Sequence, residues 1–366
     1  MSIRRSRRAV WLAVPCLVLL PACGVGLGGL LPGAQEPPAI LVTDAPNSSA
    51  TPTPFQPLAG SPTPAASPSH TATPTVTPTP VDPWEDFPGP AEASATEIPR
   101  PMPRIPQSPE VVNVMLLGSD ERPYTGGYRT DTMMLMSLDP GTGTAVLVSF
   151  PRDLYLYIPG WRMDRINTAD VRGGPELTAL TILYNFGLEV DHWARVDFAG
   201  FMGAVDTLGG LTVQSTGYLF DECGGRYWSY APGSYTMNGF QALCYVRMRK
   251  ANDGDFDRLR RQQEMVRAFF SKVLTLDGLS RVPQLYSQFI TSVRTDLLVG
   301  DLLPLAPLGL QLGTDETRIR QYRIDRTMVD GWRVPTTGAA VLLPKRDVIQ
   351  AMLNEAFGVP TPVSSP

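Results

Sequence analysis

Residues 113–120 read Asn-Val-Met-Leu-Leu-Gly-Ser-Asp, an apolar run that ends in two small residues and a carboxylate. The run from Val111 to Leu117 has the length and the bounding turn residues of a buried strand. Asp120 follows it directly, where loops commonly carry functional side chains. Next along the chain, Arg129-Thr130-Asp131 opens a second apolar run, Thr132 to Leu138. The sequence therefore predicts two adjacent strands, each with a carboxylate at one end.

The two carboxylates, Asp120 and Asp131, are predicted to hold a divalent cation. Carboxylate oxygens suit hard cations such as Mg²⁺, which keep phosphate oxygens in their coordination shell. Mn²⁺ is the alternative ion. The competing structural interpretation of Asp120 is an Asx-turn, in which the side chain bonds its own backbone.

A second set of polar residues lies more than a hundred residues downstream and consists of Arg247, Arg249, Asp255, Arg258, Arg261 and Gln262. The planar donor fork of arginine matches the geometry of phosphate. The alternative is a solvated basic surface or the polar border of a helix. If the backbone at Arg247 and Arg249 is extended, both side chains share a face, whereas in a helix they diverge. Combined with the two carboxylates, these arginines favour a phosphoryl-transfer site that holds a diphosphate.

Two further arginines are candidates for the same site. Pro151-Arg152-Asp153 closes a third strand, Ala145 to Phe150, and its alternative is an ordinary exposed salt bridge. Arg165 carries a weaker signal. Asp153 and Asp255 are candidates for a general base, although orienting the arginines is the role that we favour for both.

The remaining pattern predicts further strands and helices. Strands are expected at Val190 to Val196, Leu211 to Gln214 and Arg318 to Ile324, and helices at Pro175 to Phe186, Phe198 to Leu208, Phe256 to Leu274, Val282 to Val293 and Asp347 to Phe357. Asn238 and Gln241 form a capping-box pattern that opens another short helix. The predicted fold is α/β, with a central mixed sheet and helices on both faces.

Composition divides the chain into segments. More than half of its 37 prolines fall between Pro37 and Pro109, in a stretch rich in Thr-Pro repeats. Such a segment buries too little apolar surface to offset the entropy of ordering. We therefore expect a disordered linker at 33–109, a folded catalytic domain at 110–358 and a disordered tail at 359–366. The net charge of −4 gives no support to a nucleic-acid partner.

Residues 1–32 are expected to export the chain and anchor it in the cytoplasmic membrane. Four arginines between Arg4 and Arg8 precede the apolar stretch Ala9 to Leu20. Leu20-Pro21-Ala22-Cys23 resembles a lipobox in which Cys23 is lipidated. The alternative is an uncleaved transmembrane anchor, because apolar and glycine residues continue to Leu31. In both cases the folded domain lies on the outer face of the membrane.

Export affects how the two cysteines of the folded part are interpreted. Cys223 lies in a glycine-rich loop and Cys244 lies shortly before Arg247. In an oxidising compartment an isolated pair favours a disulfide over a metal site. Two buried free thiols are the alternative.

Several catalytic classes lack their residues in this sequence. There is no nucleophile elbow and no P-loop, and the two histidines, His70 and His192, do not support a His-based triad. Catalysis by positioning and charge neutralisation remains, which is what phosphoryl transfer requires.

At these residues the chain resembles the LytR-CpsA-Psr family of bacterial cell-envelope proteins. The matching text includes residues 113–120, 129–133 and 149–153, then Arg165-Ile166-Asn167, 206–210, 239–243 and the block from Arg247 to Gln263. The resemblance spans Val111 to Gly358 and implies a three-layer α-β-α domain.

The resemblance also implies an activity and its residues. A glycopolymer would pass from a polyprenyl (pyro)phosphate carrier to a muramic-acid hydroxyl of peptidoglycan, with Mg²⁺ held by Asp120 and Asp131. The residues expected to act in catalysis are Arg152, Arg247, Arg249, Asp255 and Arg258, and those expected to bind substrate are Arg129, Arg165, Arg261 and Gln262. Arg165 stands where many relatives carry lysine. The lipid would occupy an apolar tunnel beside Phe269 and Phe270.

Two other functions remain open on the sequence. The same site with water as acceptor would hydrolyse the lipid pyrophosphate. A non-catalytic lipid-phosphate binding or regulatory protein would bind the carrier without turnover.

Overall fold

The computed structural model describes residues 87–120, 129–249, 254–273 and 293–359. They all belong to one of the two units into which the chain divides, Thr75–Pro366. The other unit, Met1–Pro74, lies outside the described residues, and with it the expected signal segment and Cys23. Most of the helix expected at Val282 to Val293 also lies outside them.

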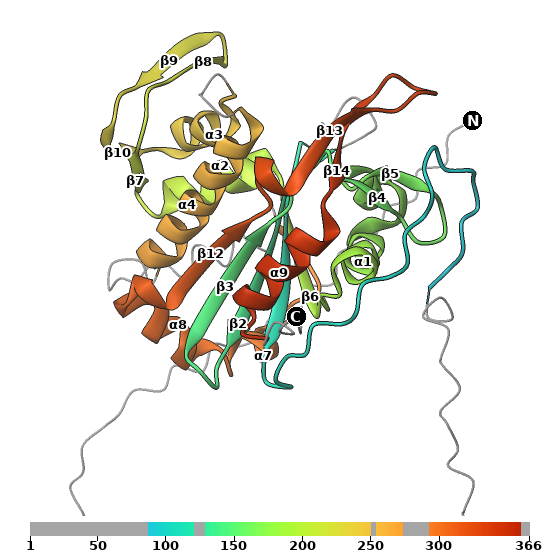
Figure 1. The fold of residues 1–366 in the computed structure, drawn as a ribbon. Coiled ribbons are helices and arrows are strands. Elements are labelled where there is room, and N and C mark those ends of the chain that lie inside the picture. Colours follow the sequence, from blue (N-terminus) through green and yellow to red (C-terminus); the bar gives the residue numbers. More distant parts are fainter. Residues whose placement is uncertain (1–86, 121–128, 250–253, 274–292, 360–366) are drawn as a thin grey trace, which may run out of the picture. The chain divides into compact units, whose positions relative to one another are not determined.

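A six-stranded mixed sheet forms the centre of the described structure (Figure 1). Its order is β11 (Val293–Thr295), β6 (His192–Val196), β1 (Val112–Ser119), β2 (Thr130–Asp139), β3 (Thr144–Ser149) and β12 (Ile319–Arg323). β1 pairs antiparallel with β2 and parallel with β6, while β3 pairs antiparallel with β2 and parallel with β12. The prediction of a central mixed sheet is confirmed. Because β1, β3, β6 and β12 run in the same direction, their carboxyl ends share one edge of the sheet.

Helices cover both faces of this sheet, because its strands are apolar on both sides. On one face, Met115 and Leu117 belong to the same core cluster as Ile182 of α1 (Asn167–Phe186) and Leu353 of α9 (Arg346–Ala356). On the other face, Met134 packs with Val266 of α4 (Asp255–Val273). α8 (Ala306–Thr314) packs against Ala145 of β3 through Leu308 and Leu312. The predicted three-layer α-β-α arrangement is therefore confirmed.

A second apolar core lies beside α4 and joins two helices to the β8–β9 hairpin and the antiparallel pair of β7 and β10. Its elements are α2 (Phe198–Thr207), β7 (Leu211–Ser215), β8 (Leu219–Cys223), β9 (Arg226–Tyr230), β10 (Gly233–Met237) and α3 (Gly239–Arg247). The expected capping box opens α3: Asn238 Oδ1 accepts from the amide of Gln241, and Gln241 Oε1 accepts from the amide of Asn238. Cys223 and Cys244 form a disulfide with a Cα–Cα distance of 5.7 Å. The disulfide fastens the β8–β9 hairpin to α3.

Several short elements were not predicted. Those at the carboxyl edge of the sheet are β4 (Tyr155–Tyr157), β5 (Met163–Arg165), β13 (Val329–Arg333), β14 (Ala340–Pro344) and the 3₁₀ turn Arg326–Met328. At the opposite edge, α7 (Val299–Leu302) follows β11 and the 3₁₀ turn Glu316–Arg318 precedes β12. β13 and β14 form an antiparallel hairpin, and Leu342 pairs in turn with Leu154 next to β4.

The expected linker boundary is wrong, because residues 87–109 pack on the folded domain. Ile105 is 5% exposed within the main core. The hydroxyls of Tyr157 and Tyr184 donate to the carbonyls of Pro88 and Pro99, both at 2.7 Å. We call residues 87–107 the N-terminal strap. Its prolines supply carbonyl acceptors and apolar surface without needing partners of their own for an amide hydrogen.

Helix α1 differs from the prediction in its start. It begins at Asn167 and not at Pro175, with a kink at Gly173 and Gly174 just before Pro175. It ends as expected at Gly187, whose left-handed conformation (φ 67°) caps the helix. Among the described residues, no helix combines the length and apolar character needed to cross a membrane.

Candidate active site

The predicted site residues meet at the carboxyl edge of the sheet. Asp120 follows β1, Pro151-Arg152-Asp153 follows β3, and Asp131 lies at the start of the antiparallel strand β2. The first turn of α4, with Asp255 and Arg258, completes the group. Ligands of open α/β sheets commonly bind outside the carboxyl ends of the strands, so this edge is the expected place for a site.

A β-bulge determines how Asp131 is presented. The pairing of β1 with β2 runs Gly118 to Thr132 and then Ser119 to Thr130, so Asp131 is the extra residue. A bulged residue leaves the regular pleat, and bulges recur next to active sites because they redirect a side chain. Here the carboxylate of Asp131 is directed to Arg152, whose Nη1 donates to Asp131 Oδ1 at 2.7 Å.

Asp120 follows the last residue of β1 and lies next to the start of β2. Its Oδ1 accepts from the backbone amide of Arg129 at 2.6 Å. This bond joins the end of β1 to the residue that precedes β2 and is not an Asx-turn, and it fixes the carboxylate. No group of three or more histidine, cysteine or acidic residues suited to a metal occurs among the described residues. Two carboxylates nevertheless fit Mg²⁺, which commonly takes one or two from protein and completes its shell with water and substrate phosphate.

Arg152 lies at the centre of the acidic residues. Its guanidinium group reaches Asp131 at 2.7 Å, Asp153 at 3.3 Å and Asp255 at 3.9 Å. Burial works against its charge, but the hydrogen bond and charge of Asp131 and the charges of Asp153 and Asp255 outweigh it, so the pKa of Arg152 is raised. Arg152 is thus a fixed cation held from three sides.

Arg258 is a second fixed cation and is almost completely buried. Its side chain is 4% exposed, and Nη2 lies 3.5 Å from Asp255 Oδ2. Burial lowers the pKa of Arg258; Asp255 opposes this shift, and the charges of Arg152 and Arg249 add to it. These mutual effects place Arg258, Arg152 and Arg249 within electrostatic reach of each other.

Asp153 and Asp255 each join two or more arginines. Asp153 Oδ1 lies 3.4 Å from Nε of Arg165, whose Nη2 donates to the carbonyl of Ala340 at 2.7 Å. Asp255 Oδ1 lies 3.7 Å from Nε of Arg249. Among the described residues, four arginines (152, 165, 249 and 258) thus meet three aspartates (131, 153 and 255). We call this group the Arg-Asp cluster, and it carries net positive charge.

Three buried polar atoms at the cluster lack hydrogen-bond partners within the described part of the chain. They are Nε of Arg165, Nε of Arg258 and Oε1 of Gln262, which lies one turn further along α4. Buried polar groups are rarely left unpaired, and exceptions point to strain, function or a missing ligand. An unpaired guanidinium donor beside excess positive charge is the arrangement expected of an anion site.

Arg261, predicted to bind substrate, is placed elsewhere. It is 0% exposed, and its guanidinium donates to the carbonyls of Tyr245 (3.2 Å) and Met248 at the end of α3. The side chain therefore caps a helix terminus inside the second core and presents no exposed atom to a ligand.

Arg247 and Arg129 have contacts with residues outside the Arg-Asp cluster. Arg247 is the last residue of α3, and its guanidinium stacks over the ring of Phe198 at 4.7 Å. The helix ends between Arg247 and Arg249, and Arg249 contacts Asp255 while Arg247 contacts Phe198. Phe198 follows β6, whose Val196 is in register with Gly118 of β1, so Arg247 lies on the Asp120 side. Arg129 is exposed, and its backbone amide is the group that contacts Asp120.

Sequence reasoning missed a buried network behind the bulge. Asp170 of α1 is 0% exposed and pairs with Arg195 of β6, and it also accepts a hydrogen bond from the hydroxyl of Thr130. Thr130 immediately precedes Asp131. The sequence signal was a charged residue, Arg195, between the apolar Ala194 and Val196 of a predicted strand.

Comparison with known proteins identifies the family. A model of the LytR_cpsA_psr family matches residues 90–356. The chain is similar to a protein of Oceanobacillus iheyensis named polyisoprenyl-teichoic acid–peptidoglycan teichoic acid transferase TagU, at 35% identity over 51% of this chain and 59% of that protein. A protein of the same name from Bacillus licheniformis is 33% identical over 60% of this chain and 70% of that protein.

The fold has a solved counterpart as well. The crystal structure of TagV from B. subtilis superimposes with a TM-score of 0.59 and 22% identity, covering 70% of this chain and 100% of that chain. The sequence alignments span 59% and 70% of the two TagU proteins, so their full lengths are not matched. The family match nevertheless extends from the N-terminal strap to α9 and contains the whole Arg-Asp cluster. This chain belongs to the LytR-CpsA-Psr family.

Proposed function

We propose that the protein is a phosphotransferase that moves a glycopolymer from a polyprenyl (pyro)phosphate carrier to peptidoglycan. It would act on the outer face of the cytoplasmic membrane, anchored through residues 1–32. The observation that carries the proposal is the Arg-Asp cluster, where the buried Nε of Arg258 lacks a partner among the described residues beside three further arginines. The TagU relatives, named as polyisoprenyl-teichoic acid–peptidoglycan transferases, support the substrate class. The Cys223–Cys244 disulfide fits an exported protein.

The arginines would bind and neutralise the diphosphate. Arg152 and Arg258 are held rigidly by Asp131, Asp153 and Asp255, so little reorganisation is needed when a phosphate arrives. Arg165 and Arg249 are more exposed and would close on the anion from outside. Asp120 and Asp131 would hold Mg²⁺, which supplies charge neutralisation at the phosphate oxygens when bound.

The reaction would be a single displacement at phosphorus. The acceptor hydroxyl oxygen forms a bond to the phosphorus that bears the glycopolymer, and the bond from that phosphorus to the bridging oxygen breaks. Polyprenyl monophosphate leaves, and the hydroxyl proton passes to a carboxylate. Asp153 and Asp255 are the carboxylates of the Arg-Asp cluster that also border an open pocket.

The lipid would run along the face of the sheet beneath α4. Val266 and Phe270 are partly buried there against Met134, Met136 and Leu147. Phe269, expected on the same side, packs instead in the second core. The proposed lipid path therefore rests on Phe270 and its neighbours and not on both phenylalanines.

The test is transfer by the purified soluble domain. A lipid-linked glycopolymer, Mg²⁺ and peptidoglycan fragments are supplied, and the fragments are analysed for a new phosphodiester. We expect Asp120→Ala, Arg152→Ala and Arg258→Ala each to abolish transfer, while the exposed Arg320→Ala on β12 retains it. Undiminished transfer by all three site variants would overturn the assignment.

The same assay separates the alternatives. Release of polyprenyl phosphate without any phosphodiester on the fragments would identify a hydrolase. Tight binding of the lipid donor without turnover would identify a non-catalytic lipid-phosphate protein. Chelation of divalent ions by EDTA should stop transfer, and adding Mg²⁺ or Mn²⁺ should restore it.

A further inference from the structure

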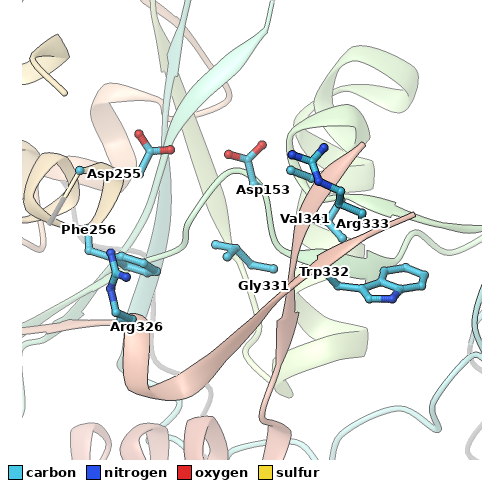
Figure 2. Close-up of a pocket in the computed structure, with 11 residues that line it drawn as sticks. Asp153, Asp255, Phe256, Arg326, Gly331, Trp332, Arg333 and Val341 are labelled. Atoms are coloured by element: carbon cyan, nitrogen blue, oxygen red, sulfur yellow. The ribbon is translucent and has the colours of Figure 1, made fainter. Parts of the chain in front are cut away.

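A pocket of about 500 Å³ opens beside the Arg-Asp cluster and is not used by the residues proposed to bind the donor. It lies between the start of α4 and the β13–β14 hairpin (Figure 2). Its volume falls within the range of about 300–1,000 Å³ that is typical of small-molecule sites. Asp153 and Asp255 belong both to its lining and to the cluster, so a ligand in the pocket would touch the proposed phosphate site.

The lining divides by chemistry into three parts. Asp153 and Asp255 present their carboxylates at one side (Figure 2). Phe256 and Leu342 supply apolar surface. Arg326 lies over the ring of Phe256, with its guanidinium carbon 5.7 Å from the ring centroid, and Arg333 belongs to β13 on the hairpin side. Both arginines are exposed.

A glycine keeps the pocket open. Gly331 of β13 is in register with Leu342 of β14, so a side chain at residue 331 would project from the same face as Leu342. A Cβ built at Gly331 meets no atom within 4 Å, and its backbone lies outside the left-handed region. A larger residue would therefore fill the space without strain or clash.

The charges of the lining decide which kind of ligand fits. The two carboxylates at the inner side accept hydrogen bonds from hydroxyl groups. An apolar surface suits the C–H face of a sugar ring. Two exposed arginines on the flanks would bind carboxylates of the same ligand. These three features together describe a sugar that carries carboxylate groups.

We propose that this pocket is the acceptor subsite and that it binds a carboxylate-bearing glycan, such as a muramic-acid-containing peptidoglycan fragment. The inference rests on the proposed transferase function and adds the acceptor site to it. The sugar hydroxyl would lie at Asp153 and Asp255, facing the phosphate held by Arg152 and Arg258. Arg326 and Arg333 would bind the carboxylates of the glycan. They would therefore act in acceptor binding and not in the chemical step.

The test compares acceptor and donor kinetics in matched variants. Gly331→Val fills the pocket, and Gly217→Val is its control, because Gly217 also has an open Cβ position and lies in the β7–β8 connection. We expect Gly331→Val to raise the KM for peptidoglycan fragments by about tenfold or more, the equivalent of one lost charge-assisted contact. Binding of polyprenyl phosphate and the melting temperature should stay those of the control.

A second arm tests the carboxylate recognition. Transfer is measured to fragments with free carboxylates and to the same fragments with amidated carboxylates. The wild type should prefer the free form, and Arg333→Gln should bring the two KM values together without changing donor binding. An unchanged acceptor KM in Gly331→Val, or an unchanged preference in Arg333→Gln, would overturn the pocket assignment. If the wild type transfers to no fragment at all, the proposed transferase function is overturned, and not only the assignment of the pocket.

Discussion

Arg258 carries its charge in a place that water barely reaches. Its side chain is 4% exposed, and burial lowers its pKa, helped by Arg152 and Arg249. Arginine tolerates this shift because its ordinary pKa is above about 12. A lysine has an ordinary pKa of only about 10.4 and gives up its proton more readily when buried. The choice of arginine at residue 258 therefore keeps the site charged at every physiological pH.

Replacing Arg258 by lysine should make transfer sensitive to alkaline pH. Burial would depress the pKa of the new ammonium group, so the cation is present at low pH and is lost as the pH rises through that lowered pKa. We expect Arg258→Lys to keep residual activity near neutrality and to lose it on the alkaline side before the wild type does. The measurement is kcat/KM against pH for both proteins. Parallel profiles would show that Arg258 does not act through its charge.

The Asp170–Arg195 pair behind the bulge should be costly to break. Both side chains are buried, so Asp170→Asn would leave the charge of Arg195 without its counter-ion and cost about 3–5 kcal/mol of unfolding free energy. Asp330→Asn is the control, because Asp330 pairs with Lys345 at the surface at 3.1 Å and should cost less than about 1 kcal/mol. Chemical denaturation measures both values. Equal losses would contradict the assigned role of the buried pair.

The β8–β9 hairpin depends on one covalent link to α3. Cys223 and Cys244 are 21 residues apart, and a disulfide closing such a loop stabilises by about 3 kcal/mol in the chain-entropy model. Asp221 of the hairpin also accepts from the backbone amide of Arg249 at 2.8 Å. The link therefore connects the hairpin to a segment of the site.

Removing the link should destabilise the domain without preventing its folding. We expect Cys223→Ser combined with Cys244→Ser to lower the free energy of unfolding by about 3 kcal/mol. The wild type treated with dithiothreitol should show the same loss, whereas the double variant should not respond to the reductant. Denaturation curves with and without reductant supply the measurement. If the reductant does not change the free energy of unfolding of the wild type, the disulfide does not stabilise the domain.

The long elements followed from the sequence because each has a regular apolar period. The strand runs at Val111 and Thr132 and the helix at Phe256 appear within two residues of their predicted starts. β4, β5, β13 and β14 were missed, since three to five residues are too few to show an apolar period. The second half of the proposed acceptor pocket comes from these missed strands.

The site was predictable where residue type alone decides the chemistry. Asp131, Arg152, Asp255 and Arg258 meet as expected. Arg261 was indistinguishable from Arg258 by type, because three residues along a helix leave both on nearly the same side. Their roles differ because the carbonyls at the end of α3 accept hydrogen bonds from Arg261. Arg261 therefore caps α3, whereas Arg258 remains the cation proposed to bind the ligand.

The N-terminal strap shows why composition alone misplaced a domain boundary. Its prolines suggested disorder, yet Ile105 enters the core and the ring of Phe87 packs on Tyr184 with centroids 5.0 Å apart. The amide of Ile105 donates to the carbonyl of Gly187 at 2.8 Å. A proline-rich segment with few internal contacts can thus be ordered by a surface that other parts of the chain provide.

Gly187 is the position where this strap can be tested. It has a left-handed conformation (φ 67°), and an added Cβ would lie 2.0 Å from the carbonyl oxygen of Pro103. Gly187 therefore caps α1 and also leaves room for the N-terminal strap. Gly187→Ala should therefore combine the cost of that conformation, about 1–2 kcal/mol, with displacement of the strap. Gly338→Ala is the matched control, because Gly338 has φ 69° but an open Cβ position. Limited proteolysis should cleave residues 87–107 rapidly in Gly187→Ala and slowly in the control, and melting temperatures should fall further in the first. Equal cleavage and equal melting in the two variants would mean that the strap does not depend on its close approach to the end of α1.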